Sequence, residues 1–319
     1  MTFPSKTTTP YRAISDRESS SIHCHGTLGW TILLACLVLL SSCTDTSDRI
    51  VVGSKNFTEQ VILGELLAQY IETQLQVPVE RKLNLVGTFL CHEAVKSGEI
   101  DLYVEYTGTA FTGILKRTPV QEVRLAFQTV QEEYVRQFDL VWTEPLGFEN
   151  TFALMIRGND ARSMNLTTIS EAAQQTPKWR AGFGYEFLER ADGFKGLAEL
   201  YGLSFLEAPR EMDLGLMYRA LSEGQVDLIA GNSTEGLVEH LDLVILEDDR
   251  EYFPPYQAAP VVNRKSLERH QGLREVLARL GNTISDEEMR NLNYAVDGQH
   301  RDLKEVVGSF LATKGLSAP

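Results

Sequence analysis

Aromatic side chains stand at three places where this chain is expected to border a ligand cleft. Tyr106 follows a predicted strand, and Phe152 and Tyr256 lie at two predicted crossings between lobes. A quaternary ammonium group has no hydrogen to donate, so proteins hold it against several ring faces, each contributing about 0.5–2 kcal/mol. These rings therefore predict a site for a methylated amine.

Two basic residues are candidates for holding an anionic group on the same ligand. A bound carboxylate needs a fixed cation or a helix N-terminus. Lys55 stands just before the first predicted helix, and Arg190 lies in the second half of the chain. We expect either or both of them near a ligand carboxylate.

Patterns typical of catalysis and metal binding are weak. Cys91 and His92 are neighbours, but adjacent side chains on a helix or strand point apart, so a packed cysteine beside a polar histidine is favoured over a catalytic pair. The histidines show no metal-ligand spacing, and residues 53–55 lack the glycine pattern of a phosphate loop. We expect no enzyme activity, no cofactor and no metal.

The composition argues against two further classes of protein. The 319 residues are 43% hydrophobic and carry 30 Lys+Arg against 44 Asp+Glu, for a net charge of −14. Nucleic-acid-binding proteins normally show the opposite sign. No apolar run reaches the ~18–20 residues that a spanning helix needs, which excludes a channel or permease.

The N-terminal segment resembles a bacterial lipoprotein leader. Residues 30–40 read WTILLACLVLL, and Leu40-Ser41-Ser42-Cys43 follows. We expect residues 1–42 to be a signal peptide, Cys43 to be lipidated and 43–49 to be a tether. Cys91 then remains alone, so no intramolecular disulfide is expected.

The rest of the chain alternates short apolar runs with helical patterns, as βαβ units do. Residues 50–53 predict a strand, Asn56 predicts a helix N-cap that forms a capping box with Glu59, and 79–85 predicts the next strand. A parallel sheet covered by helices is the expected result.

A short internal sequence repeat, called the echo below, indicates two similar lobes. Residues 94–102 read AVKSGEIDL and residues 220–228 read ALSEGQVDL, 126 residues apart. Each copy predicts a helix end, a glycine that stops it and a strand that runs into a polar loop. Ligands of open α/β sheets lie beyond the carboxyl ends of strands, so two such loops would face one cleft.

Segments that contain proline and glycine predict where the chain crosses from one lobe to the other. We expect lobe 1 to comprise 50–149 and 257–319, and lobe 2 to comprise 150–256. Pro254-Pro255 predicts a stiff connector, and two crossings would make a hinge. Helices are expected over 265–280, from Ser285 with a capping box to Glu288, and over 302–312.

Four motifs recur here in one order, and together they resemble the substrate-binding component of ABC importers for glycine betaine, carnitine and choline. They are GSKNFTEQ at 53–60, EYTGT at 105–109, EFLER-x-DG at 186–193 and FPPY at 253–256. The resemblance implies a type II periplasmic-binding-protein fold, with two α/β lobes on a two-stranded hinge. It also implies delivery of the ligand to a membrane permease powered by a cytoplasmic ATPase, by a receptor expected to be monomeric.

The resemblance further implies roles for individual residues. An aromatic cage would be formed by Tyr106, Phe152, Tyr256 and a ring in the second echoed loop, with a backbone carbonyl near Asn150 against the methyl groups. Lys55, Thr109 and Arg190 would lie near the polar end of the ligand, and Gln60 would line the pocket. The expected ligand-binding residues are Lys55, Gln60, Tyr106, Thr109, Asn150, Phe152, Arg190, Asn232 and Tyr256.

The chain departs from the family pattern at two cage positions. Asn232 replaces the usual tyrosine in the second echoed loop, and Phe152 keeps a ring but lacks a hydroxyl. Loss of one ring would weaken a trimethylammonium ligand by roughly 5- to 30-fold. Either another ring, Tyr185 or Tyr103, completes the cage, or the ligand has a polar group there, as a ring-bearing betaine or an amino-acid-like zwitterion would. The residues also leave two other functions open: an enzyme that uses Cys91, or a sensor that informs a signalling protein.

Overall fold

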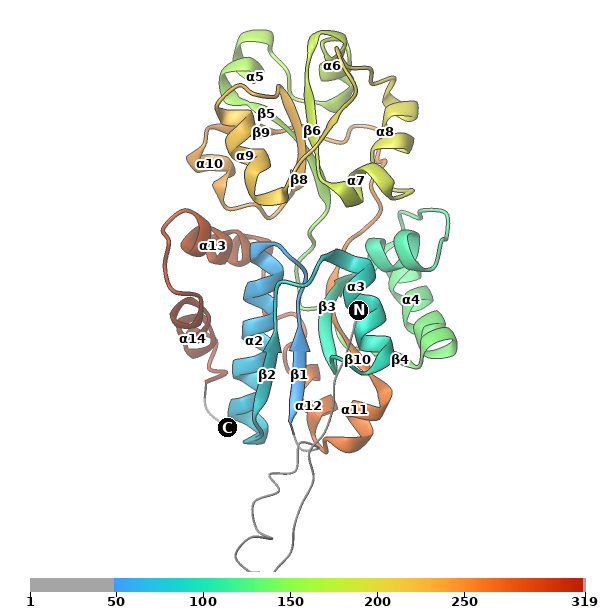
Figure 1. The fold of residues 1–319 in the computed structure, drawn as a ribbon, viewed down its shortest axis with the longest axis vertical. Coiled ribbons are helices and arrows are strands. Elements are labelled where there is room, and N and C mark those ends of the chain that lie inside the picture. Colours follow the sequence, from blue (N-terminus) through green and yellow to red (C-terminus); the bar gives the residue numbers. More distant parts are fainter. Residues whose placement is uncertain (1–48, 318–319) are drawn as a thin grey trace, which may run out of the picture. The chain divides into compact units, whose positions relative to one another are not determined.

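The computed structural model describes residues 49–317, and the predicted leader and the lipidation site Cys43 lie outside the described residues. The described chain forms two five-stranded sheets, each flanked by helices (Figure 1). Within 49–317 no helix combines the length and apolar character that a membrane crossing requires.

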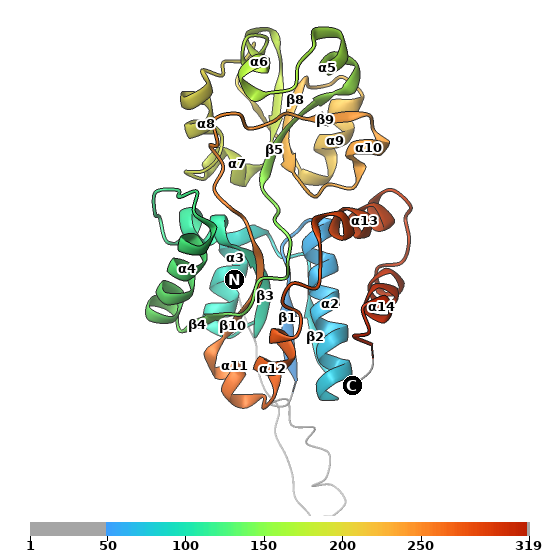
Figure 2. The same cartoon turned by 180° about the vertical axis from the view of Figure 1, so that it is seen from behind.

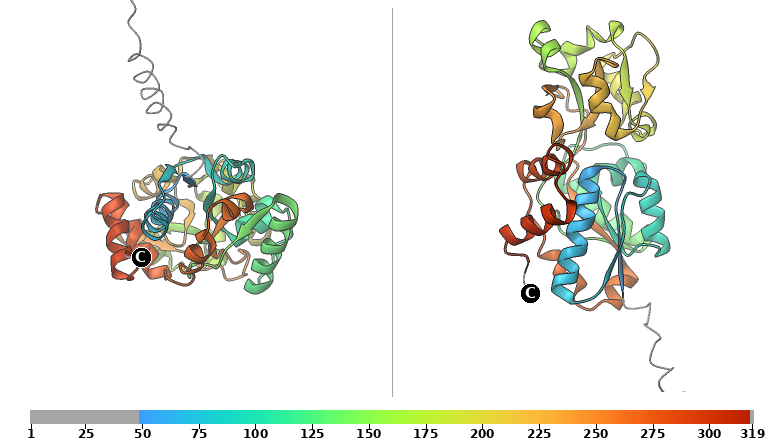
Figure 3. Two further views of the ribbon diagram at one scale, coloured as in Figure 1. Left: turned by 90° about the horizontal axis from the view of Figure 1, so that it is seen from below. Right: turned by 60° about the vertical axis from the view of Figure 1, so that its left-hand side comes forward.

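The first sheet has the strand order β2-β1-β3-β10-β4. Its strands are β1 (Ile50–Gly53), β2 (Val79–Lys82), β3 (Leu102–Tyr106), β4 (Leu140–Trp142) and β10 (Ala258–Asn263). The helices of this lobe are α2 (Thr58–Leu75), α3 (Gly87–Ser97), α4 (Val123–Phe138), α11 (Arg264–Arg269), α12 (Leu273–Ala278), α13 (Asp286–Asp297) and α14 (Leu303–Thr313), with a π-helical segment η1 (Thr109–Ile114) after β3. Helices α13 and α14 pack on α2 (Figure 3).

The second sheet has the order β7-β6-β8-β5-β9. Its strands are β5 (Phe152–Arg157), β6 (Ala181–Phe183), β7 (Arg210–Glu211), β8 (Leu228–Asn232) and β9 (Leu243–Ile245). The helices of this lobe are α5 (Gly158–Met164), α6 (Ile169–Ala173), the 3₁₀ turn η2 (Thr176–Lys178), α7 (Tyr185–Glu189), α8 (Phe194–Tyr201), α9 (Leu214–Ser222) and α10 (Leu237–His240).

The two copies of the sequence echo occupy equivalent places in the two sheets. Gly98 and Gly224, which follow α3 and α9, have φ of 80° and 73°, a conformation that favours glycine. Asp101 and Asp227 precede β3 and β8. The Asp101 carboxylate accepts the backbone N–H of Val51 in β1 at 2.7 Å, and the Asp227 carboxylate accepts that of Arg180, just before β6, at 2.9 Å. The carboxyl end of β3 in one lobe therefore corresponds to that of β8 in the other.

Each sheet contains one antiparallel strand that arrives from the other lobe. β5 follows the first crossing and pairs with β8 and β9, while β10 follows the second crossing and pairs with β3 and β4. The crossing segments run side by side (Figure 2), joined by an antiparallel bridge between Glu149 and Gln257 and by the Asn150 N–H donating to the Tyr256 carbonyl at 3.1 Å. The expected two-lobed α/β fold with a two-stranded hinge is confirmed.

Of the two capping boxes predicted from the sequence, one is confirmed and one is wrong. Ser285 and Glu288 form the predicted capping box at α13. The capping box of Asn56 and Glu59 does not form, because α2 begins after Phe57 and Glu59 instead bonds to distant side chains.

Two predicted elements are shorter than expected. The strand predicted over 79–85 ends at Lys82, before Asn84 takes a left-handed conformation with φ of 65°. The helix predicted over 265–280 is divided into α11 and α12, because Gly272 between them has φ of 86°.

Candidate ligand-binding site

A cavity of about 460 Å³ lies where the carboxyl ends of β3 and β8 face each other across the two lobes. Its size is within the range of small-molecule sites. Tyr106 and Thr109 border it from the first echoed loop, and Gly231 and Asn232 border it from the second. Because 126 residues separate the echo copies, Tyr106 and Asn232 are equivalent positions on opposite walls.

Three aromatic side chains predicted from sequence border this one cavity. They are Tyr106 at the end of β3, Phe152 at the start of β5 and Tyr256 in the second crossing. The rings of Phe152 and Tyr256 have centroids 6.0 Å apart and are nearly perpendicular. Both tyrosines are almost fully buried, so water competes little for their ring faces.

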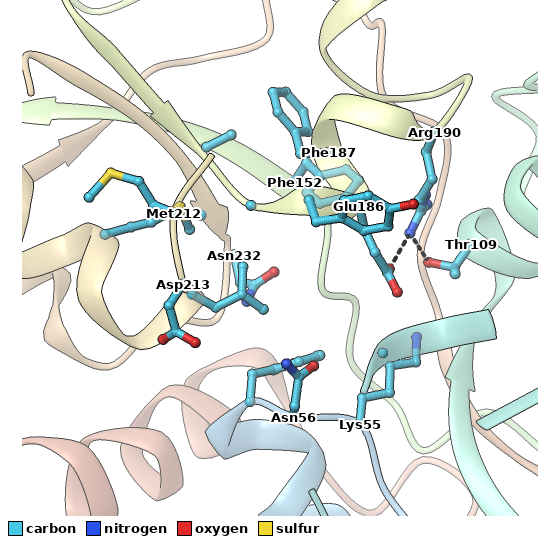
Figure 4. Close-up of a pocket in the computed structure, with 18 of the residues that line it drawn as sticks. Lys55, Asn56, Thr109, Phe152, Glu186, Phe187, Arg190, Met212, Asp213 and Asn232 are labelled. Carbon is cyan, nitrogen blue, oxygen red and sulfur yellow. Dashed lines mark hydrogen bonds and ion pairs between the residues drawn. The ribbon is translucent and has the colours of Figure 1, made fainter. Parts of the chain in front are cut away.

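Arg190 forms the basic end of the cavity. Its Nε and Nη2 donate to the Asp192 carboxylate at 2.9 and 2.5 Å. Its Nη1 donates to Thr109 Oγ1 at 3.0 Å and lies 3.7 Å from a carboxylate oxygen of Glu186 (Figure 4). The guanidinium carbon lies 4.9 Å from the ring centroid of Phe152 and 5.9 Å from that of Tyr256. A guanidinium has five N–H donors, so these three bonds leave two for a ligand.

The charges around Arg190 are fixed by burial and pairing. Burial opposes the charged guanidinium, but the Asp192 carboxylate outweighs it and holds the pKa of Arg190 above its usual value. Burial would likewise raise the pKa of Asp192, yet Arg190 and the Tyr256 hydroxyl, which donates to Asp192 at 2.5 Å, lower it overall. The pair therefore stays ionised, and it fixes the Tyr256 ring as well.

Lys55 is buried and its Nζ donates to Glu105 at 2.6 Å, while it lies 5.0 Å from the centroid of the Tyr106 ring. An ammonium group has three donors, so this pairing leaves donors available. The sequence predicted Lys55 as a cation near a ligand carboxylate, and the structure shows it bordering the cavity as half of a buried ion pair.

The opposite end of the cavity is polar without being basic. Asn232, Asp213 and Met212 lie together there, apart from Arg190 and Thr109, with Asn56 on the facing lobe (Figure 4). Asn232 pairs with Phe152 across β5 and β8, which places the amide at the base of the aromatic wall. The sequence analysis did not single out Asp213, Met212 or Asn56 as site residues.

Among the predicted residues, Gln60 lies elsewhere. Lys55, Tyr106, Thr109, Asn150, Phe152, Arg190, Asn232 and Tyr256 line the cavity, but Gln60 is fully buried behind it, against the phenol of Tyr106. Asn150 borders the cavity, and its side-chain amide donates to Glu59 at 2.7 Å. Gln60 therefore supports a wall residue rather than lining the cavity.

Of the two rings suggested to complete the cage, Tyr103 is excluded and Tyr185 remains. Tyr103 is fully buried in the core of the first lobe and donates to Glu105 at 3.2 Å. It stands three residues before Tyr106 on β3, and side chains at odd spacing on a strand face opposite sides. Tyr185 borders the cavity mouth and is 56% exposed, so it is placed to cover a ligand.

Cys91 and His92 are packed side chains, as the sequence favoured. Burial raises the pKa of the Cys91 thiol to about 12 and lowers the pKa of His92 to about 4. His92 packs edge-on against Tyr134 and Phe138. A thiol and an imidazole that are both neutral at pH 7 lack the thiolate that nucleophilic catalysis needs.

Comparison with known proteins places the chain in a family. Residues 48–313 match the substrate-binding domain of the ABC-type glycine betaine transport system. The carnitine transport binding protein OpuCC of Listeria monocytogenes is 32% identical over 288 residues, covering 88% of this chain and 93% of that protein.

A second relative is longer than this chain. The ergothioneine transport permease/ergothioneine binding protein EgtU of Helicobacter pylori is 34% identical over 286 residues, covering 89% of this chain and 51% of that protein, so this chain spans about half its length.

A solved structure of a glycine betaine/carnitine/choline ABC transporter protein agrees with the fold, with a TM-score of 0.70 and 30% identity over 84% of this chain and 99% of the other. The chain therefore belongs to the family of substrate-binding domains of ABC-type glycine betaine transport systems and is a solute-binding protein, not an enzyme.

Proposed function

We propose that the protein is the lipid-anchored receptor of an ABC importer and binds a betaine-type ligand between its two lobes. The observation that carries the proposal is that three rings and a buried arginine, contributed by both lobes and the hinge, border one cavity. The rings of Tyr106, Phe152 and Tyr256 would hold the methylated nitrogen. Arg190 and Thr109 would bind the carboxylate.

The charge of the cavity favours a zwitterion or a cation over an anion. The lining residues include two basic side chains, Lys55 and Arg190, and three acidic ones, Glu186, Glu211 and Asp213. Both bases already have a carboxylate partner. A ligand carboxylate would thus be bound by directed hydrogen bonds rather than by excess positive charge, and the ligand's cationic group would be attracted by the rings and the acids.

A second candidate ligand is a ring-bearing betaine. Asn232 stands where a ring would complete the cage, and Asp213 and Asn56 extend the polar end of the cavity beside it. An imidazole-thione ring attached to the betaine carbon skeleton would find amide and carboxylate partners there. The Helicobacter pylori relative is named for ergothioneine, a histidine betaine with such a ring.

Calorimetric titration of the purified protein separates these ligands. Glycine betaine, carnitine, choline and ergothioneine are compared with glycine and histidine, which lack the methyl groups. We expect saturable heat only with methylated compounds, and tighter binding of ergothioneine than of glycine betaine if Asn232 meets a ring. No heat with any trimethylammonium compound would reject the proposed ligand class.

The expected partners are a membrane permease and its cytoplasmic ATPase, and the site of action is outside the cytoplasm. We propose that Cys43 carries the lipid that keeps the receptor at a membrane surface. Metabolic labelling with a fatty-acid analogue should mark the wild-type protein and not Cys43→Ala, whereas Cys91→Ala serves as the matched control and should keep the label. Labelling of Cys43→Ala would reject this anchor.

A further inference from the structure

Glu59, on the first turn of α2, accepts hydrogen bonds from four side chains beside the cavity. Its Oε1 accepts from the Tyr106 hydroxyl at 2.6 Å and from Asn150 Nδ2 at 2.7 Å. Its Oε2 accepts from the Thr234 hydroxyl at 2.5 Å and from Asn293 Nδ2 at 3.2 Å. The residue is 3% exposed.

These contacts suit an ionised carboxylate and are hard to replace. An ionised carboxylate only accepts hydrogen bonds, and all four groups around it can donate. Burial raises the pKa of Glu59, and the hydroxyls and amides oppose this. The first turn of a helix also favours a negative charge. Removing one donor would leave a buried acceptor partly unsatisfied, which is costly.

The four donors come from different parts of the fold. Tyr106 is a wall of the cavity, Asn150 belongs to the first crossing segment, and Asn293 belongs to α13 of the first lobe. Thr234 lies in the second lobe, two residues beyond Asn232, and its backbone carbonyl also accepts from Asn293 Nδ2 at 2.8 Å. One carboxylate therefore connects a wall ring, the hinge and the opposite lobe.

We propose that Glu59 is a positioning residue that couples the orientation of the Tyr106 ring to contact between the lobes. Through Oε1 it holds the phenol of Tyr106, and through Oε2 it holds Thr234 of the second lobe. Movement of the second lobe away from the first breaks the contact between Oε2 and Thr234, leaves Asn293 as the remaining donor to Oε2, and loosens the anchor of Tyr106. This proposal rests on the proposed function only where it concerns ligand affinity, because the contacts of Glu59 with Tyr106 and Thr234 are made by protein groups alone.

The test measures the distance between lobes in the ligand-free full chain. Dyes are attached through azide-bearing residues introduced at Arg124 on α4 and Arg219 on α9, whose side chains are 80% and 78% exposed. The variants are Thr234→Val, which removes the hydroxyl with little change in shape, and Thr234→Ser, which keeps a hydroxyl at that position. Thr176→Val, at a buried threonine of the second lobe whose hydroxyl donates only locally, is the matched control.

We expect Thr234→Val to broaden the interlobe distance distribution and shift it to larger separation, and Thr234→Ser and Thr176→Val to retain the wild-type distribution. An unchanged distribution in Thr234→Val, with the melting temperature preserved, would overturn the coupling. This result does not depend on which ligand binds.

A second measurement uses Tyr106→Phe, which keeps the ring and removes its anchor to Glu59. We expect the interlobe distance to stay near wild type and the affinity for the ligand found by calorimetry to fall about 10-fold, the effect of one hydrogen bond to a charged group. Undiminished affinity in Tyr106→Phe would overturn the positioning role while leaving the ligand assignment intact. If the wild-type protein bound none of the tested ligands, that result would instead reject the proposed function.

Discussion

Asn232→Tyr is the substitution that best separates a simple betaine from a ring-bearing one. Asn232 ends β8, pairs with Phe152 and occupies the position equivalent to Tyr106 on the opposite wall. A tyrosine there would add a ring face to the three already present. One cation–π contact is worth about 0.5–2 kcal/mol, which corresponds to roughly 2- to 30-fold in affinity.

The two ligand classes should respond in opposite directions. Glycine betaine and carnitine should bind Asn232→Tyr more tightly by that factor, because the cage gains a face. A ring-bearing betaine should bind more weakly, because the new side chain fills the polar end beside Asp213 and removes the amide. Asn232→Leu is the control, since it removes the amide without adding a ring, and it should not tighten any ligand.

The assay is calorimetric titration of wild type and both variants with glycine betaine and ergothioneine under one set of buffer conditions. Far-ultraviolet circular dichroism checks that folding is retained. Affinities that change for neither ligand in Asn232→Tyr would show that position 232 does not contact the ligand. The reasoning from the echo and from the lining of the cavity would then be refuted.

Three further perturbations have expected outcomes. Tyr106→Ala and Tyr256→Ala should each weaken ligand binding at least 10-fold in calorimetry while circular dichroism shows a folded protein, and undiminished affinity would exclude the ring as a wall of the site. Arg190→Met should lower the free energy of unfolding in urea by about 3–5 kcal/mol, because it leaves the buried Asp192 carboxylate unpaired, and adding Asp192→Asn should recover part of that loss; equal stability of the single variant would contradict the buried pair. Burial raises the pKa of Glu235 from 4.5 to about 7, so the protonated form favours the folded state and this stability is lost as pH rises from about 4.5 through 7. Glu235→Gln should therefore reduce the fall in unfolding free energy between pH 5 and pH 8 by about 2 kcal/mol, after allowance for solvent screening beside the cleft, and an identical pH dependence in both proteins would contradict it.

Features set by short-range chemistry were predictable from the sequence. The glycines at 98 and 224 end their helices in the left-handed conformation, and Ser285 caps α13, because these geometries depend on residues within a turn of one another. The ordered motifs also predicted which rings and which arginine border the cavity. The three rings lie at a strand end or in a crossing segment, and Arg190 directly follows the short helix α7, so each side chain is free to face the cleft.

The sequence pattern alone could not show which residues of a motif line the cavity and which lie behind it. Gln60 lies next to Glu59 in the sequence, yet it is behind the wall, and Tyr103 shares β3 with Tyr106, yet it faces the core. Lys55 was recognised as a site residue but not as the partner of Glu105, 50 residues away. In each case the side chain's direction follows from packing between elements.

Glu59 shows most directly where sequence ends and tertiary structure begins. Read locally, its spacing from Asn56 predicts a capping box, and the sequence by itself determined the family, the two-lobed fold and most residues of the cavity. Its actual hydrogen-bond donors lie 47, 91, 175 and 234 residues away. Only the tertiary structure could decide its role, because a buried carboxylate must take its partners from whichever elements the packed lobes bring to it.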